Sequence, residues 1–170
     1  MSSIPSSRPP ASDRIRWRQT PESHDPAQIR ALIEATAVFS AEEAAVAAEL
    51  AATTLDGSET YRFLFAEDGR GKLLGYACFD RVPFSTGAFD LYWIAVDARL
   101  RGSGLALDLM ARAAKLIARR GGTQIFAETS SREPYAPARG FYRKAGFDEV
   151  ARFEDFYDVG DAKIIFRLML

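Results

Sequence analysis

The sequence predicts a mixed α/β or α+β fold. Residues 89–96 (FDLYWIAV) are almost wholly apolar and aromatic, as expected of a strand covered on both faces. Beyond a glycine-rich loop, apolar residues recur at spacings of three and four between Ala106 and Ile117, and charged residues occupy the opposite face. This pattern indicates an amphipathic helix, and further strand and helix patterns along the chain favour a layered fold.

The first third of the chain is expected to hold one strand and two helices. Residues 15–18 form the predicted first strand. Asp25 and Pro26 are a favourable helix start, with the aspartate as N-cap and the proline at the first helical position, and this helix should run to about residue 37. Ser40 and Glu43 match a capping box, which predicts a second, alanine-rich helix that ends near residue 54.

The rest of the chain predicts mostly strands. Residues 60–66 and 73–82 are predicted strands turned by Asp68-Gly69-Arg70-Gly71. Residues 123–128 form a strand after the amphipathic helix, and residues 147–156 and 162–170 form two more strands after a short helix. The predicted order is therefore β-α-α-β-β-β-α-β-α-β-β.

The glycine-rich loop, Arg101-Gly102-Ser103-Gly104-Leu105-Ala106, joins the apolar strand to the amphipathic helix. A helix N-terminus leaves amide N–H groups unpaired and carries a partial positive charge, and glycines let a phosphate approach those amides. The spacing differs from known phosphate loops: no Gly-Lys precedes Ser or Thr, and Leu107 replaces the third glycine of the dinucleotide fingerprint. The loop is thus either an anion cradle or an ordinary strand-to-helix turn.

A second segment, residues 138–147 (ARGFYRKAGF), predicts a short helix closed by Gly146. Taken in order, Val96, the glycine loop and this helix with Tyr142 resemble the GNAT N-acetyltransferase superfamily, in its small bacterial form, over about residues 15–170. The resemblance implies a mostly antiparallel central sheet with about four helices. It says little about the acceptor.

Acetyl-CoA is the cosubstrate that the resemblance implies. The glycine loop is similar to the family's pyrophosphate loop, and the backbone N–H of Val96 would bind the thioester oxygen. Thr129 is expected either to contact the pantetheine arm or to satisfy local backbone. Many members carry asparagine seven residues before the tyrosine, where Tyr135 stands here, so that contact is not carried over. The expected cosubstrate-binding residues are Ile94, Val96, Arg101, Gly102, Ser103, Gly104, Leu105, Ala106, Thr129 and Tyr142.

Acetyl transfer to an amine requires two proton movements. An alkyl ammonium, with a pKa near ~10.4, must lose a proton before its nitrogen attacks, and the departing thiolate must gain one. Tyr142 is the expected general acid, because a tyrosine with a pKa near ~10 stays protonated at neutral pH; otherwise it only packs its helix against the sheet. Glu128, at the end of a predicted strand, is the candidate general base; otherwise it is a hydrogen-bond partner of the adjacent loop or a member of a surface ion pair. Glu67 competes for the same role.

The acceptor side is lined, in the family, by the first two helices and the last hairpin. Aromatic rings together with carboxylates suit a cationic amine, so the expected acceptor is a small primary amine. The alternative is a solvated hairpin turn whose acids only keep the protein soluble. The candidate acceptor residues are Phe39, Tyr92, Asp155, Tyr157 and Asp161.

The expected function is an N-acetyltransferase that moves the acetyl group from acetyl-CoA to an amine by direct transfer in a ternary complex. A noncatalytic acyl-CoA-binding module would explain the loop but leaves Tyr142 idle. An acyltransferase that uses another acyl-CoA or a hydroxyl acceptor would share every motif. Homodimer formation is left open.

Composition argues for one domain and against several classes of protein. A chain of 170 residues, 48% of them hydrophobic, can bury a core without disulfides or metal. The net charge of −1 gives no sign of a nucleic-acid or membrane-surface partner, and no apolar run approaches the ~20 residues of a membrane span. One histidine, His24, and one cysteine, Cys78, offer neither metal-ligand spacing nor a Ser-His-Asp or Cys-His apparatus.

The N-terminal segment is expected to differ from the rest. Residues 1–13 are rich in Ser, Pro and Arg and predict a disordered tail, and residues 14–170 predict a single acetyltransferase domain. The tail lacks the apolar stretch of a secretory signal. With a single cysteine in the chain, the expected location is the cytoplasm.

Overall fold

The computed structural model describes residues 15–170, so the predicted disordered tail, residues 1–13, lies outside the described residues. The strands are β1 (Arg16–Arg18), β2 (Arg62–Glu67), β3 (Leu73–Arg81), β4 (Ala88–Val96), β5 (Gln124–Ser130), β6 (Asp148–Asp158) and β7 (Asp161–Met169). The helices are α1 (Asp25–Ala35), α2 (Ala41–Asp56), α3 (Leu105–Arg119) and α4 (Ala136–Lys144), with short 3₁₀ turns η1 (Ala98–Leu100) and η2 (Glu133–Tyr135).

The predicted fold class and the order of elements along the chain are confirmed. Within residues 15–170, seven strands form one sheet in the order β1-β2-β3-β4-β5-β7-β6. Every neighbouring pair is antiparallel except β4 and β5, which run parallel. The last strand of the chain, β7, lies inside the sheet, and β6 forms the outer edge. The order of elements along the chain does not reveal that the last two strands exchange places in the sheet.

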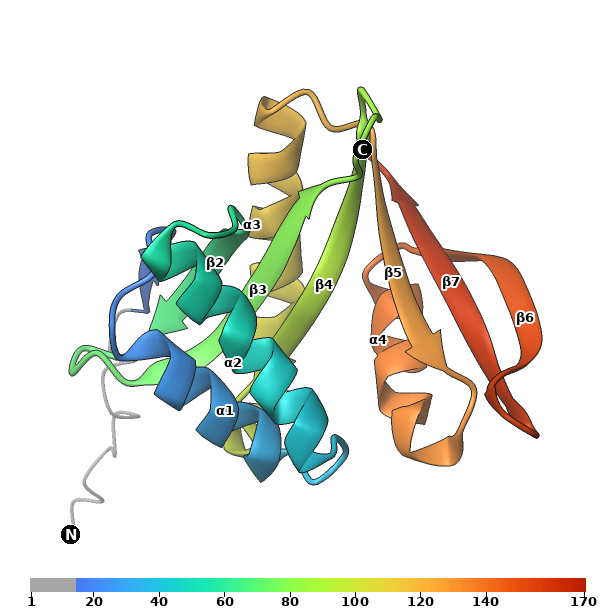
Figure 1. Ribbon diagram of the computed structural model, residues 1–170, viewed down its shortest axis with the longest axis horizontal. Coiled ribbons are helices and arrows are strands. Elements are labelled where there is room, and N and C mark those ends of the chain that lie inside the picture. The colour runs from blue at the N-terminus through green and yellow to red at the C-terminus, as the bar shows by residue number, and fades with distance from the viewer. Residues whose placement is uncertain (1–14) are drawn as a thin grey trace, which may run out of the picture.

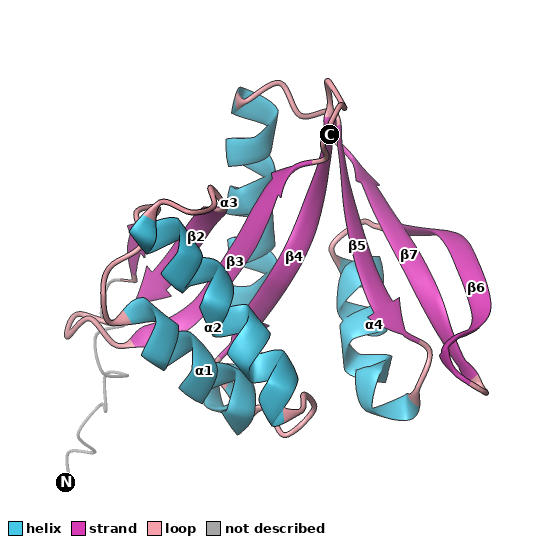
Figure 2. Cartoon of the chain, in the orientation of Figure 1, coloured by secondary structure: helices cyan, strands magenta, loops and turns pink. Residues whose placement is uncertain are grey.

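The helices cover the two faces of the sheet unequally. Figure 1 shows α1 and α2 in front of the β2–β4 half, with α3 behind it and α4 behind β5. One core joins α1 and α2 to β2 and β3 around Phe63, Phe65 and Tyr76. A second core joins α3 and α4 to the opposite face around Phe89, Leu109 and Phe166. The three layers are seen again in Figure 2, where helices flank the strands.

The start of α1 differs from the prediction. The helix begins at Asp25 itself, its N-cap is His24, and no side chain caps it. The Asp25 carboxylate instead accepts the Glu22 N–H at 2.6 Å and two hydrogen bonds from Arg18, at 2.8 and 2.7 Å. A buried ionic contact with β1 therefore takes the carboxylate that was expected to cap the helix.

The other predicted helix signals are confirmed. Ser40 and Glu43 form the reciprocal capping box at the start of α2. At the end of α4, Gly146 has a φ of +90°, its N–H donates to the Arg143 carbonyl, and the Phe147 N–H donates to the Tyr142 carbonyl. These two bonds form a Schellman motif, which requires a left-handed residue and therefore favours glycine.

The outer strand β6 is paired irregularly with β7. Their register shifts between Glu149 and Ala151 and again between Phe153 and Asp158. None of the helices described between residues 15 and 170 is both long and apolar enough to cross a membrane.

Candidate active site

The sheet opens between its two parallel strands. β4 and β5 pair over three residues each, from Ala88 with Gln124 to Asp90 with Phe126. Beyond Asp90 the strands diverge, as Figure 1 shows. A cleft of about 1170 Å³ lies along this opening and is lined by both strands, the α1–α2 loop, the glycine loop and α4. With Tyr157 and Asp161 of the closing hairpin, four separate parts of the sequence therefore meet at one site.

The opening corrects the expectation that residues 89–96 are covered on both faces. Phe89 and Leu91 are buried, but Tyr92 is 40% exposed and residues 93–96 are only partly buried. The strand is apolar to its end because its second half lines the cleft and packs on a helix layer, rather than because it lies between two complete layers.

β4 carries a bulge at Tyr92. Leu91 pairs with Phe79 and Trp93 pairs with Cys78, so Tyr92 is an extra residue without a partner on β3. The bulge reverses the alternation of side chains: Leu91 and Ile94 both pack on the α3–α4 core, and Trp93 packs on the α1–α2 core. Tyr92 itself is left to line the cleft.

The backbone of Val96 faces the opening. The Asp97 N–H donates to the Leu74 carbonyl at 2.8 Å, which makes Asp97 and Leu74 a hydrogen-bonded pair. Because hydrogen-bonded and non-hydrogen-bonded pairs alternate in an antiparallel ladder, Val96, paired with Gly75, points its N–H away from β3 and toward the gap left by β5.

The glycine loop leads into α3 as an array of amides. Gly102 and Gly104 have φ values of +78° and +85°, and Gly104 is the N-cap of α3. Within residues 15–170, the N–H groups of Gly102, Gly104 and Ala106 are not hydrogen-bonded to backbone or side chain. Together with the helix dipole, they form the donor set that an anion requires.

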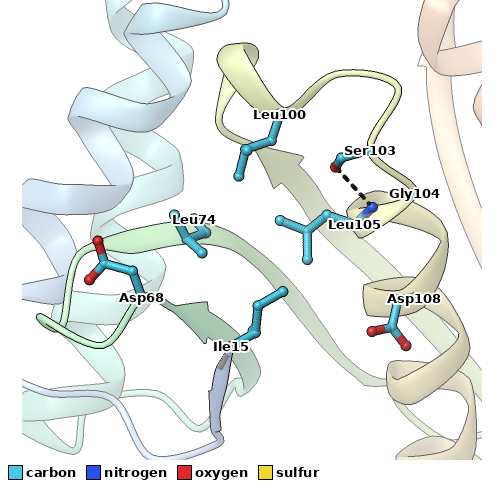
Figure 3. Close-up of a pocket in the computed structure, with 8 residues that line it drawn as sticks. All are labelled: Ile15, Asp68, Leu74, Leu100, Ser103, Gly104, Leu105 and Asp108. Carbon is cyan, nitrogen blue, oxygen red and sulfur yellow. Dashed lines mark hydrogen bonds between the residues drawn. The ribbon is translucent and has the colours of Figure 1, made fainter. Parts of the chain in front are cut away.

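Ser103 points to the other side of this loop. Its hydroxyl accepts the Leu105 N–H at 3.3 Å, and it lines a smaller, mostly apolar pocket with Ile15 and Leu100 (Figure 3). The other predicted cosubstrate-binding residues all line the large cleft. Ser103 therefore supports the loop from behind and does not face the cleft.

Tyr142 projects from α4 into the cleft and is 8% exposed. Its ring packs against Phe141, Phe147 and Phe166, with centroid distances of 5.5, 5.4 and 5.3 Å. Burial raises the pKa of its hydroxyl to about 12. The side chain is therefore a protonated hydrogen-bond donor at neutral pH.

Three carboxylates line the cleft from the sheet side. Glu128 pairs with Lys163 at 2.8 Å, and Asp161 is buried, where it accepts a hydrogen bond from the Ser130 hydroxyl and lies 3.6 Å from Arg132. Asp90, at the point where the strands diverge, has its pKa raised by burial and then by the nearby Glu128.

Two predicted residues lie elsewhere. The Asp155 carboxylate does not line the cleft; it accepts the Gly160 N–H at 2.7 Å and closes its own hairpin. Glu67, the competing base, is buried and accepts a hydrogen bond from Arg18 at 3.0 Å, away from the cleft. Its position at a strand end did not reveal which side of the sheet it faces.

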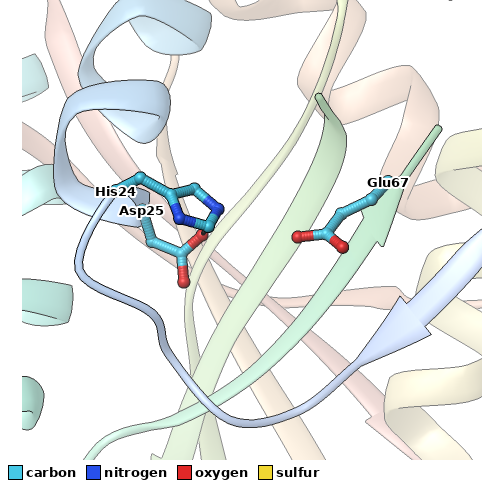
Figure 4. A group of neighbouring side chains, drawn as sticks. All are labelled: His24, Asp25 and Glu67. Atoms are coloured by element: carbon cyan, nitrogen blue, oxygen red, sulfur yellow. Dashed lines mark ion pairs between the residues drawn. The ribbon is translucent and has the colours of Figure 1, made fainter. Parts of the chain in front are cut away.

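Glu67 belongs to a compact polar cluster with His24 and Asp25, drawn in Figure 4. In the described part of the chain this is the one group of three or more His, Cys, Asp or Glu side chains with ligand atoms close enough to hold a metal. The Arg18 guanidinium lies between the two carboxylates and donates to both. The cluster is thus a buried ion-pair network that ties β1 to α1 and β2.

The sequence model of the Acetyltransferase (GNAT) family matches residues 14–147. The chain belongs to the GNAT acetyltransferase family. A protein from Desulfovibrio desulfuricans that is assigned to the same family is 40% identical in sequence, with a TM-score of 0.87 over 91% of this chain and 98% of that chain. The protein is therefore an acyltransferase.

More distant GNAT structures share the fold alone. An aminoglycoside 6′-N-acetyltransferase solved with coenzyme A has 16% identity and a TM-score of 0.71, over 91% of this chain and 96% of that chain. The ribosomal-protein-S18-alanine N-acetyltransferase of Escherichia coli has 19% identity and a TM-score of 0.68, over 91% and 93%. No curated protein sequence matches the chain.

The cleft of this GNAT acetyltransferase also contains residues that the sequence did not identify. Asp90 could have been noticed as the one charge inside an apolar strand. The Tyr135 hydroxyl donates to Glu43 at 3.2 Å, and its ring packs edge-on against Phe39. At Tyr135 the sequence signalled only a departure from the family pattern, and it gave no sign of the contact with Glu43.

Proposed function

We propose that this GNAT protein is an acetyl-CoA-dependent N-acetyltransferase that transfers the acetyl group directly to a primary amine. One observation carries the proposal: the glycine-loop amides, the Val96 backbone and the Tyr142 side chain all border one continuous cleft. An anion site, an oxyanion donor and a proton donor are the three groups that direct acyl transfer from a thioester requires.

The cosubstrate is expected to follow the opening between β4 and β5. Its pyrophosphate would bind the free amides of Gly102, Gly104 and Ala106, with Arg101 at the same end of the cleft. The thioester oxygen would then accept the Val96 N–H. The coenzyme A bound to the distant aminoglycoside acetyltransferase supports this choice of cosubstrate.

The chemical step forms one C–N bond and breaks one C–S bond. The ammonium first loses one proton, and the resulting neutral amine attacks the thioester carbonyl. The attacking nitrogen then loses a second proton, and the sulfur leaves and is protonated. Tyr142 supplies the proton to sulfur, for which its raised pKa, about 12, keeps the hydroxyl in the acid form. Glu128 accepts the amine proton, directly or through water, with Lys163 holding its carboxylate in the cleft.

The acceptor is expected to be a small cationic amine. Phe39, Tyr92 and Tyr157 supply aromatic surface in the cleft, and Glu128 and Asp161 supply negative charge. Aromatic rings and carboxylates favour an ammonium over a neutral acceptor. Asp155 is left out of this set because its carboxylate closes the hairpin.

A thiol-release assay tests the proposal. The protein would be incubated with acetyl-CoA or longer acyl-CoAs and with panels of primary amines and alcohols. Fast release with acetyl-CoA that depends on an amine supports the proposal. Release that depends on alcohols or needs a longer acyl chain points to the other acyltransferase. Tight CoA binding with no release at all indicates a noncatalytic binding module.

A further inference from the structure

A hydrogen bond joins the two halves of the molecule across the cleft. The Tyr135 hydroxyl, from η2, donates to Oε1 of Glu43, on α2, at 3.2 Å. The two residues are 92 positions apart in sequence, and both line the cleft. Because β4 and β5 separate here, this contact bridges an opening that the sheet itself does not close.

The Glu43 side chain is held in place for this contact. Its Oε2 accepts the Ser40 N–H at 2.7 Å, and the Glu43 N–H donates to the Ser40 hydroxyl at 3.1 Å. Both carboxylate oxygens are therefore used, one by the capping box and one by Tyr135. The start of α2 thus presents a fixed acceptor toward η2.

An aromatic row runs beside the hydrogen bond. The Phe39 ring lies 5.1 Å from the ring of Trp93 on β4 and 5.8 Å from the ring of Tyr135, both in edge-to-face geometry. All three rings line the cleft. The row therefore continues from β4 to η2, and its edge-to-face contacts stabilise it beyond burial alone.

The bridge borders the part of the cleft assigned to the acceptor. Tyr135, Glu43, Asp161 and Tyr157 all line this cleft. Burial, then Glu43, Asp161 and Tyr157, raise the pKa of Tyr135. Tyr135 stands seven residues before Tyr142, in the 3₁₀ turn that precedes α4, and both side chains line the cleft. A residue there can limit an acceptor without touching the acetyl group.

We propose that the Glu43–Tyr135 bridge closes this end of the cleft and makes Tyr135 the residue that limits the size of the acceptor. The inference rests on the proposed acetyl transfer to an amine. Breaking the bridge should leave the cosubstrate site intact and admit amines that are too bulky for the native protein.

The activity test compares Tyr135→Phe, which removes only the hydroxyl, with Tyr135→Ala, which also removes the ring. For a series of amines of increasing bulk, Tyr135→Ala should raise the ratio of kcat/KM for bulky over small acceptors about tenfold. Tyr135→Phe should raise this ratio less, and the CoA affinity of both variants should equal that of the native protein. Phe153→Ala, which removes an exposed ring outside the cleft, is the matched control. The proposal is overturned if a folded Tyr135→Ala protein has an unchanged ratio of kcat/KM values. It is also overturned if this variant loses CoA affinity and gains no activity toward bulky amines.

A second readout needs no activity. The chain has two tryptophans, so Trp17→Phe leaves Trp93, at the end of the aromatic row, as the only indole. In that background Tyr135→Ala should raise acrylamide quenching of Trp93 by about twofold, because Phe39, which packs on Trp93, loses the ring that packs on its other side and the end of the cleft opens. If the native protein acetylates no amine, the proposed function fails, but the quenching experiment still tests the bridge. An unchanged quenching constant in the Tyr135→Ala variant would mean that the Glu43–Tyr135 bridge does not close the cleft.

Discussion

A methyl group at position 75 would lie 2.9 Å from Cγ1 of Val96 and 3.0 Å from the Ala95 carbonyl oxygen. A side chain at position 75 of β3 would therefore crowd the residue of β4 proposed to bind the thioester oxygen. We expect Gly75→Ala to push Val96 toward the cleft and to lower kcat by about tenfold to a hundredfold, the range expected for a small misplacement of a reacting group. Steady-state kinetics would measure this.

Gly69→Ala is the control for that variant, because a methyl group at Gly69 meets nothing within 4 Å. It should retain full activity. If both alanine variants have the same kcat, the position of Val96 does not matter for turnover.

Gly104→Val should weaken CoA binding. The valine would occupy a left-handed backbone position and place a branched side chain among the free amides of the loop. The Kd measured by calorimetry should rise about tenfold or more, equivalent to about 1.4 kcal/mol.

Gly57→Val separates this binding effect from backbone strain. Gly57 has a similar φ of +81°, likewise meets nothing within 4 Å, and lies at the C-terminal end of α2. The Tm should fall in both valine variants, and CoA affinity should fall only at position 104. Equal affinity in a folded Gly104→Val protein would falsify the anion cradle.

Tyr142→Phe should lower kcat roughly ten- to a thousandfold, the lower part of the range for general acid catalysis, and leave CoA affinity nearly unchanged. Since burial raises the pKa of Tyr142 to about 12, the hydroxyl keeps its proton below that pH, and native turnover should show no alkaline limb from this group between about pH 7 and 10. A pH–rate profile would check both points.

Tyr76→Phe is the matched control for the loss of a buried hydroxyl. Tyr76 is fully buried, and its hydroxyl has no hydrogen-bond partner within residues 15–170. Removal of an unpaired buried polar atom should leave stability unchanged or higher, with normal turnover. If Tyr142→Phe also keeps native turnover, sulfur is protonated by another group.

Arg18→Ala should cost about 3–5 kcal/mol of unfolding free energy, because Asp25 and Glu67 would remain buried without their cation. The exposed Arg16, which lies 3.7 Å from Glu67, is the matched control, and Arg16→Ala should cost under ~1 kcal/mol. Urea titrations would compare them. Similar losses for the two would mean that the network does not stabilise the fold.

The sequence predicted the structural features that depend on neighbouring residues alone. The capping box at Ser40, the left-handed Gly146 and the amphipathic stripe of α3 depend on residues within one or two turns, and all three occur in the structure. The order of elements and the fold class followed from these signals.

Tertiary contacts account for what the sequence did not reveal. Asp25 carries the residue type of an N-cap, but Arg18 from another strand binds it. The bulge at Tyr92 adds one residue to an apolar run without interrupting the run, so periodicity cannot detect it. The separation of β4 from β5, which creates the cleft, depends on the register of two distant segments.

The irregular pairing of β6 affects how the protein behaves at high concentration. A strand of eleven residues at the edge of a sheet, with exposed rings at Phe153, Phe156 and Tyr157, would normally be a template for another molecule's strand. The register shifts beside Ala151 and Phe153 interrupt the row of N–H and C=O groups that such pairing needs. The irregular pairing therefore protects the β6 edge of the sheet against growth into aggregates.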